Sequence, residues 1–400
     1  MNNGNDGTSS RLHYLDALRA FVMTLGVVLH ASVIGHFWFS RGVGYFSGLF
    51  RMKLFMLIAG FFVALLISRR GINATLRERL IRFGVPAVAG TILLNPIADY
   101  FLYGTAVDFI SPNAFFSNNL QWNKAGFEWG KIAPPYMSWH LQLWFLYVAV
   151  ILIAGTPLFL RLIDLAIVKR AATAIFYSPK GDVRAGMLGL FMGLAFAGGR
   201  VAHFVTTQQA GVDSPLNYLA MNTWLYLPYF ILGLVAFRNE KIMEALHTVS
   251  LPWIALSFGA LAASHVAYKP VLQLAGLGPA ELVEYLGKGF AGYFVCVILL
   301  ATFRKVANKP RTFADYLSKV SYSVYIFHVL MISIVQYILV STGYDRISTY
   351  WLSIPLAYAA CIVAHTVLVA SNPVGDFLFN GKIPASKIVA SRAAETASTV

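Results

Sequence analysis

Two ionisable residues, Arg19 and His30, lie within an apolar stretch at residues 15–36 that is about one membrane span long. On a helix they stand roughly 16 Å apart along the axis, which is about half of a ~30 Å hydrocarbon core. Ionisable groups at that depth are costly and mark a candidate functional site. The plainer alternative is that Arg19 reaches the interface along its aliphatic stem and that His30 is a neutral imidazole bonded to a neighbouring helix.

Other ionisable residues fall within apolar stretches or at their ends, and a set of them indicates a polar cavity. They include Arg51, Lys53, Asp99, His140, Arg200, His203, His265, Glu284, Lys288 and His328. Arg51 and Lys53 are two residues apart, so on a helix they point in different directions. No nucleophile-elbow, phosphate-loop or zinc-protease motif occurs, and a histidine without a serine or cysteine motif favours general-base catalysis.

Arg79 and Arg82 are three residues apart and share one face of a predicted helix. Two guanidinium groups on one face could hold the phosphates of a nucleotide-like donor. Most other basic residues between apolar stretches are explained by membrane topology alone.

The composition predicts an all-α polytopic membrane protein. The 400 residues are 58% hydrophobic and 12% charged, whereas soluble domains carry about 25% charged residues. The net charge of +14 lies in loops between apolar stretches, so it does not indicate nucleic acid binding. Cys296 and Cys361 lie in apolar runs and show neither metal-ligand spacing nor a disulfide framework.

Ten spans are predicted, and basic residues orient them. The predicted spans are residues 15–36, 46–67, 83–102, 139–160, 185–205, 218–237, 251–268, 282–303, 316–340 and 350–370. With the N-terminus in the cytoplasm, 22 arginines and lysines fall on the cytoplasmic side and 5 on the other. Both termini are therefore predicted to be cytoplasmic, with a disordered segment at 1–10, a transmembrane domain at 11–378, a flexible tail at 379–400 and a first span that is retained.

Several motifs, taken in order, resemble the membrane-bound acyltransferase-3 family. Arginine and histidine with ten residues between them follow LDALRA on the first span, and RMKLFMLIAGFF at 51–62 resembles the family's second span. RERLIRFGVP at 77–86, LWFL at 143–146 and SYSVYIFH at 321–328 resemble later family motifs. Family members often carry histidine two residues before the tryptophan of LWFL, whereas here His140 stands four before Trp144.

The resemblance implies ten helices around a polar, pore-like cavity and transfer of an acyl group from a cytoplasmic coenzyme A thioester to a sugar hydroxyl outside. It implies that His30 is the catalytic base, and we expect Arg19, Arg79 and Arg82 to bind the donor. The opening residues look most like family members that succinylate periplasmic glucans of Gram-negative bacteria, which implies the inner membrane, succinyl-CoA or acetyl-CoA as co-substrate, and no permanently bound cofactor or metal.

The remaining candidates form an expected acyl and acceptor pocket. They are Arg51, Trp139, His140, Trp144, Tyr322, His328, Arg200 and Lys288. A succinyl carboxylate needs a cation in a low-dielectric pocket, and Arg51, Arg200 and Lys288 are the candidates, with Arg51 first because it lies in a motif. The loop at 104–138 combines amides and aromatic rings, which suit carbohydrate, although the loop by itself is more typical of an interfacial aromatic belt. O-acetylation of a surface polysaccharide or lipid-linked sugar, and sugar transport or flipping, stay open as alternatives.

Overall fold

The computed structural model describes residues 13–32, 37–106, 139–207, 214–275, 277–309 and 312–383. The predicted disordered segment 1–10, most of the predicted tail and the loop from 107 to 138 lie outside these residues. The helices are α1 (His13–Ala31), α2 (Trp38–Arg70), α3 (Ile72–Leu93), α4 (Asn95–Ala106), η3 (Leu141–Leu143), α6 (Trp144–Asp164), α7 (Ala166–Ala172), η4 (Thr173–Tyr177), α8 (Gly181–Thr207), α9 (Pro215–Arg238), α10 (Glu240–Ala245), α11 (Leu251–Ala275), α12 (Leu277–Val306), α13 (Thr312–Ser341), α14 (Arg346–Ala364), η5 (His365–Ala370) and α15 (Pro373–Asn380).

The prediction of an all-α polytopic membrane protein is confirmed. Within the described ranges, nine helices are long and apolar enough to cross a membrane, and α3 with α4 makes a tenth span if the bent pair counts as one. A helix satisfies its own backbone hydrogen bonds, as a segment in lipid requires. The boundaries differ from the prediction most at the third span, where α3 begins at Ile72 rather than at residue 83, and next at α2, which begins at Trp38 rather than at residue 46.

The third span is broken rather than straight, because a proline interrupts it. α3 and α4 meet at an angle of 46° around Leu94, two residues before Pro96. Proline disfavours helical geometry in the residue before it and has no amide hydrogen to donate. Pro86 lies within α3 without ending that helix.

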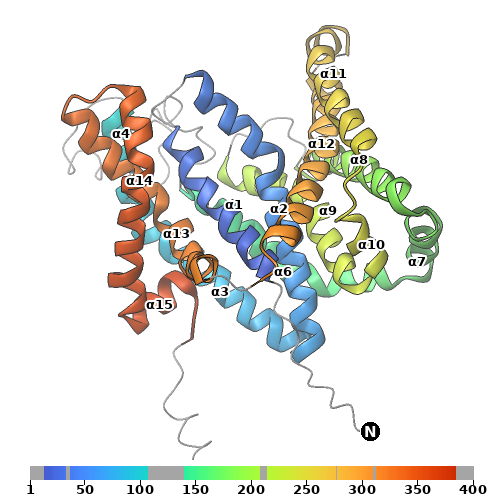
Figure 1. Cartoon of the computed structure of the whole chain (residues 1–400), viewed down its shortest axis with the longest axis horizontal. Coiled ribbons are helices and arrows are strands. Elements are labelled where there is room, and N and C mark those ends of the chain that lie inside the picture. The colour runs from blue at the N-terminus through green and yellow to red at the C-terminus, as the bar shows by residue number, and fades with distance from the viewer. Residues whose placement is uncertain are drawn as a thin grey trace, which may run out of the picture.

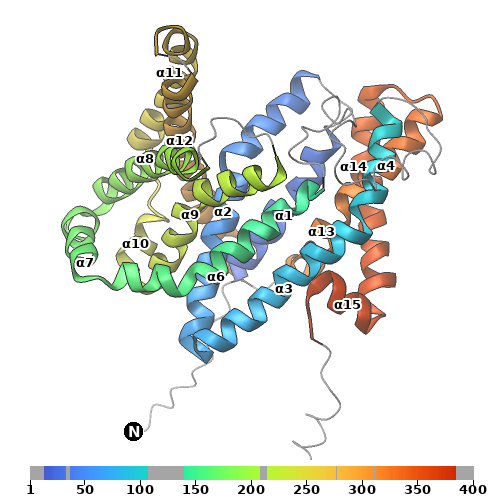
Figure 2. The same cartoon turned by 180° about the vertical axis from the view of Figure 1, so that it is seen from behind.

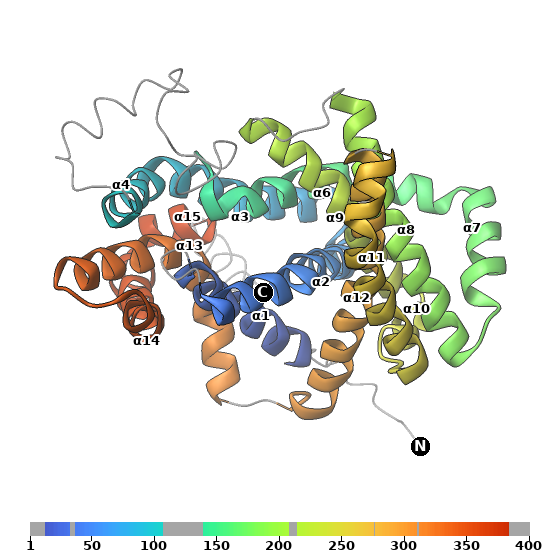
Figure 3. The same ribbon diagram turned by 90° about the horizontal axis from the view of Figure 1, so that it is seen from above.

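α1 and α2 occupy the middle of the bundle (Figure 1), and two groups of helices pack beside them. One group contains α13, α14, α4 and α15; the other contains α8 to α12 (Figure 3). α3 and α6 lie side by side across the back of the molecule (Figure 2).

α2 packs against α9 with their backbones in close approach. A Cβ on Gly60 would stand 2.1 Å from the carbonyl oxygen of Phe230, and one on Gly233 would stand 2.0 Å from that of Leu57. Small residues at such crossings allow the close van der Waals packing that associates helices in lipid. This contact holds α2, and with it Arg51, against the second group of helices.

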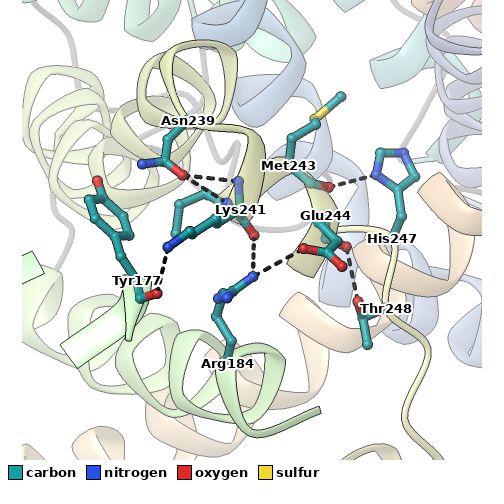
Figure 4. Close-up of polar contacts among 9 residues, drawn as sticks. Tyr177, Arg184, Asn239, Lys241, Met243, Glu244, His247 and Thr248 are labelled. Carbon is teal, nitrogen blue, oxygen red and sulfur yellow. Dashed lines mark hydrogen bonds and ion pairs between the residues drawn. The ribbon is translucent and has the colours of Figure 1, made fainter. Parts of the chain in front are cut away.

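A polar network outside the spans joins α8 to α10 (Figure 4). Arg184 donates to Glu244 Oε2 at 3.2 Å and to the carbonyl oxygen of Lys241 at 3.3 Å. The Asn239 side chain caps α10 by accepting from the amide of Lys241 at 3.0 Å, and Lys241 Nζ donates to the carbonyl oxygen of Tyr177. Arg184 therefore has a structural task at this end of the bundle.

Candidate functional site

A cavity of about 530 Å³ lies among α1, α2, α3, α6, α13, η5 and α15, and it is rich in basic side chains. Arg19, Arg79 and Arg82, the three residues predicted to bind the donor, all line it. The guanidinium group of Arg19 lies 3.3 Å from Ser318 Oγ and 3.6 Å from Asp16 Oδ1. The buried Nε of Arg79 has no hydrogen-bond partner among the residues that the structure describes. Guanidinium groups converging on one space suit a phosphorylated ligand.

Residues from the last part of the chain complete this cavity, and the sequence analysis did not identify them. Lys319, His365, Asp376, Asn380 and Lys382 line it as well. Lys382 Nζ lies 3.3 Å from Asp376 Oδ1, and Asn380 donates to the same carboxylate at 2.6 Å. α15 belongs to no recognised motif, so only Asp376 within it and Lys382 just after it could have drawn attention to it.

Tyr322 lies with the arginines rather than with the predicted acyl and acceptor pocket. It lines the basic cavity, and its hydroxyl donates to the carbonyl oxygen of Arg82 at 2.9 Å. This bond joins α13 to α3 beside the arginine pair.

His30 and His328 come from opposite ends of the chain and meet in the middle of the bundle. Their ring centroids are 5.0 Å apart, with an interplanar angle of 60°. α1 and α13 pack along each other, which brings the two histidines to the same level. His328 is buried, and His30 is half-buried at the end of α1.

Arg51 faces the same space as His328. A Cβ on Gly26 would stand 2.9 Å from Arg51 Nη1 and 3.4 Å from His328 Nε2, so both atoms adjoin one point beside α1. The absence of a side chain at Gly26 leaves the room that the guanidinium group occupies. His30, His328 and Arg51 are called the histidine–arginine cluster below.

Hydrogen bonding determines which nitrogen of His328 is available. Nδ1 lies 2.6 Å from the carbonyl oxygen of Tyr325, which can only accept, so Nδ1 carries the proton. Nε2 then presents a lone pair, and it is buried without a hydrogen-bond partner in the described part of the chain. An unpaired buried acceptor is costly, and its retention fits a group that meets a substrate.

The three candidate cations for a substrate carboxylate differ in their partners. Arg200 forms an ion pair with Glu281 at 2.9 Å, and Lys288 forms one with Glu284 at 2.7 Å. Arg51 forms no ion pair with any residue that the structure describes. Arg51 therefore keeps a charge that a ligand can neutralise.

Lys53 points away from the cluster, as its spacing from Arg51 predicts. Its Nζ donates to the carbonyl oxygen of Leu49 at 2.8 Å and lies 4.2 Å from the centre of the Phe196 ring. The side chains of Arg51 and Lys53, the two basic residues of the second-span motif, therefore contact different parts of the bundle.

Trp139, His140 and Trp144 come together with Tyr218, which the sequence analysis missed. The rings of His140 and Tyr218 stack at 5.7 Å, and those of Trp144 and Tyr218 meet edge to face at 5.5 Å. Tyr218, Tyr226 and Tyr325 lie near Arg51, which places this aromatic group beside the cluster. Aromatic rings with hydroxyl and imidazole groups suit the faces and edges of a sugar.

The turn before α6 is strained and joins α13. Leu141 adopts a positive φ of 39°, which is uncommon for a residue with a branched side chain. The turn directs the carbonyl oxygen of Gln142 to the Tyr325 hydroxyl, 2.7 Å away. The Gln142 side-chain oxygen is buried without a partner among the described residues. Strain of this kind occurs at functional sites.

Comparisons with known proteins identify a family and relatives for the chain. Residues 12–369 match the family described as "Acyltransferase domain". A protein of Salmonella paratyphi B called "Glucans biosynthesis protein C" is 28% identical over 296 residues, covering 68% of this chain and 69% of that protein. An Escherichia coli protein of the same name is 28% identical over 303 residues, covering 70% and 71%. No solved structure matches the chain.

Proposed function

The chain belongs to the acyltransferase family, and from that premise we propose that this multi-pass membrane acyltransferase moves a succinyl group from succinyl-CoA to a hydroxyl of a periplasmic glucan. One observation carries the proposal. Two imidazoles and an arginine without an ion-pair partner in the described chain gather in the bundle, next to a basic cavity.

The basic cavity is the proposed donor site. Coenzyme A carries several phosphate groups, and Arg19, Arg79, Arg82, Lys319 and Lys382 supply the cations that would bind them. The basic-residue bias supports a cytoplasmic position for this end of the bundle, where acyl-CoA is found. The relatives come from Salmonella and Escherichia coli, which supports the inner membrane of a bacterium as the proposed location.

His30 is the proposed general base. It takes the proton of the sugar hydroxyl as the oxygen attacks the thioester carbonyl. The bond between carbon and sulfur then breaks, and the thiolate takes up the proton that His30 received. The free Nε2 of His328, close to His30, offers a second acceptor that holds the hydroxyl or the imidazole in place.

Arg51 is the proposed partner of the terminal succinyl carboxylate, because Arg200 and Lys288 already face glutamates. The aromatic group of Trp139, His140, Trp144 and Tyr218 is the proposed contact for the glucan. The relatives named for glucan biosynthesis support a glucan as the acceptor.

Release of free thiol by the purified protein tests the proposal. Succinyl-CoA or acetyl-CoA is supplied with a linear or cyclic β-glucan, and His30→Ala is run in parallel. Glucan-dependent release that is larger with succinyl-CoA and lost in His30→Ala is the expected result. Release with acetyl-CoA alone indicates an O-acetyltransferase instead, and folded protein that releases no thiol with either donor indicates a transporter or another acceptor.

A further inference from the structure

The basic cavity and the histidine–arginine cluster lie one above the other along three helices. On α1, Met23 lines the cavity and His30 follows seven residues later, about 10 Å along the axis. On α13, Tyr322 lines the cavity and His328 follows six residues later, about 9 Å along. α2 runs the opposite way, and four residues, about 6 Å, separate Phe55 in the cavity wall from Arg51.

The cavity does not reach the cluster, because aromatic rings stand between them. His30, His328 and Arg51 are absent from its lining, whereas Phe55 and Phe145 belong to it. The ring centroids of Phe55 and Phe145 are 5.2 Å apart, and those of Phe145 and Tyr325 are 6.0 Å apart. Tyr325 in turn lies 5.8 Å from His328.

These three rings, Phe55, Phe145 and Tyr325, are called the aromatic layer. All three are at least 95% buried. Tyr325 is fixed on both sides, by the bond from its hydroxyl to Gln142 and by the bond between its carbonyl oxygen and His328. Phe55 and Phe145 have no polar groups on their side chains, so rotation about side-chain bonds breaks no hydrogen bond.

We propose that Phe55 and Phe145 determine which acyl groups pass from the basic cavity to the histidine–arginine cluster, and that they keep water in the cavity away from the reacting carbonyl. This inference rests on the proposed function of the cavity as the thioester site. The phosphate-bearing part of the donor stays among the arginines, and the acyl end passes between the two phenylalanine rings.

The aromatic layer would favour transfer over hydrolysis. When water attacks the thioester, a carbon–oxygen bond forms, the carbon–sulfur bond breaks, and the products are a free acid and a thiol that carries a proton from the water. Apolar rings around the acyl end exclude water from the reacting carbonyl. A smaller side chain in the layer admits both water and longer acyl groups.

The test compares Phe145→Ala, Phe145→Leu and Phe55→Ala with the unchanged protein in membranes or detergent. Thiol release is measured with and without β-glucan, using acetyl-CoA, succinyl-CoA and glutaryl-CoA. In Phe145→Ala we expect glucan-independent thiol release, relative to glucan-dependent release, to rise about 10-fold. We expect the rate with glutaryl-CoA, relative to the rate with acetyl-CoA, to rise by a similar factor, which is the usual scale for a change in pocket size. Phe145→Leu, which keeps most of the side-chain volume, is expected to show a smaller change in the same direction and gives the result if Phe145→Ala does not fold.

Phe61→Ala is the matched control. Phe61 is also a buried phenylalanine of α2 in an aromatic pair, with Phe237, but it does not line the cavity. The inference is overturned if glucan-independent thiol release rises as much in Phe61→Ala as in the variants of the aromatic layer. It is also overturned if Phe145→Leu and Phe55→Ala keep the donor preference of the unchanged protein while thiol release still requires His30. Lack of any release by the unchanged protein overturns the proposed function and this inference with it.

Discussion

At the scale of single residues, Arg51 is half-buried within a membrane-spanning helix and has no ion-pair partner among the described residues. A buried charge is costly when it is unpaired, so the protein benefits when a ligand supplies the opposite charge. Arg200 and Lys288 have glutamate partners and offer no such gain.

Replacing Arg51 should therefore change donor preference. We expect Arg51→Gln to lower the ratio of kcat/KM for succinyl-CoA over acetyl-CoA by about 10- to 100-fold, because hydrogen bonds to charged groups contribute about 1.5–3 kcal/mol. Steady-state thiol release with both donors measures the ratio. Lys53→Met, two residues away and facing Phe196, is the control and should leave it unchanged. An unaltered ratio in Arg51→Gln contradicts the assignment.

Gly26 offers a second test that replaces no ionisable residue. An added methyl group would stand 2.9 Å from Arg51 Nη1, the far end of a flexible side chain, so Gly26→Ala should fold and displace the guanidinium group. Misplacing a positioning group by about 1 Å costs up to about 100-fold in rate, and we expect a loss of kcat/KM of that order. Gly48→Ala on α2, where the methyl group would meet nothing within 4 Å, is the control. Equal activity in the two variants would show that the space beside Gly26 is not used.

The ionisable residues of the cluster could be predicted from the sequence, because charged residues are rare in apolar stretches. Gly26 could not be foreseen, since its importance lies in an absent side chain opposite a residue of another helix. The free nitrogen of His328 was also out of reach, because a backbone carbonyl of its own helix decides which nitrogen carries the proton.

At the scale of elements, the turn between α10 and α11 contains a titratable group outside the spans. Burial lowers the pKa of His247 below its ordinary range, although the bond to the carbonyl oxygen of Met243 acts in the opposite direction (Figure 4). The unfolded chain then binds a proton more readily than the folded chain. The stabilising contribution is present above the ordinary pKa of about 6.5 and is lost as the pH falls below it.

The expected outcome is a free energy of unfolding that falls between about pH 7 and about pH 5, and falls less in His247→Gln. Thermal unfolding in detergent at several pH values measures this difference. His265→Gln, on the exposed face of α11, controls for the removal of a histidine. Identical acid sensitivity of His247→Gln and the unchanged protein would exclude this turn as its source.

The helices themselves were predictable, because long apolar stretches separated by basic segments leave few alternatives. The break at Leu94 could not be predicted as readily, since Pro86 and Pro96 look alike in sequence, yet Pro86 lies inside α3 and Pro96 lies at the start of a new helix, α4. α15 was missed as part of the cavity because its position depends on packing against α3 rather than on any local pattern.

At the scale of the whole molecule, the described residues give ten spans when α3 and α4 count as one, and an even number predicts that both ends of the chain lie on one side of the membrane. Arg19 on the first helix and Lys382 after the last helix line the same cavity, which agrees with this count. The excess of basic residues predicts that this side is the cytoplasm.

Reporter fusions can test the sidedness. Green fluorescent protein fused after residue 400 should fluoresce, and alkaline phosphatase at the same place should be inactive. Fusions in the segment between α9 and α11 should behave like the C-terminal ones, while fusions in the turn between α13 and α14 should behave in the opposite way. Active phosphatase at the C-terminus would show that the molecule has the opposite orientation and that the basic cavity lies outside the cytoplasm.

The place of α15 in the cavity has a consequence for biosynthesis. The arginines of α1 and α3 leave the ribosome early, whereas Asn380 and Lys382 follow only after all the spans have been made. Segments near the N-terminus fold first during synthesis. A nascent chain that has inserted most of its helices therefore still lacks one wall of its basic cavity, and the cavity is completed only when the bundle around the histidines is already in place.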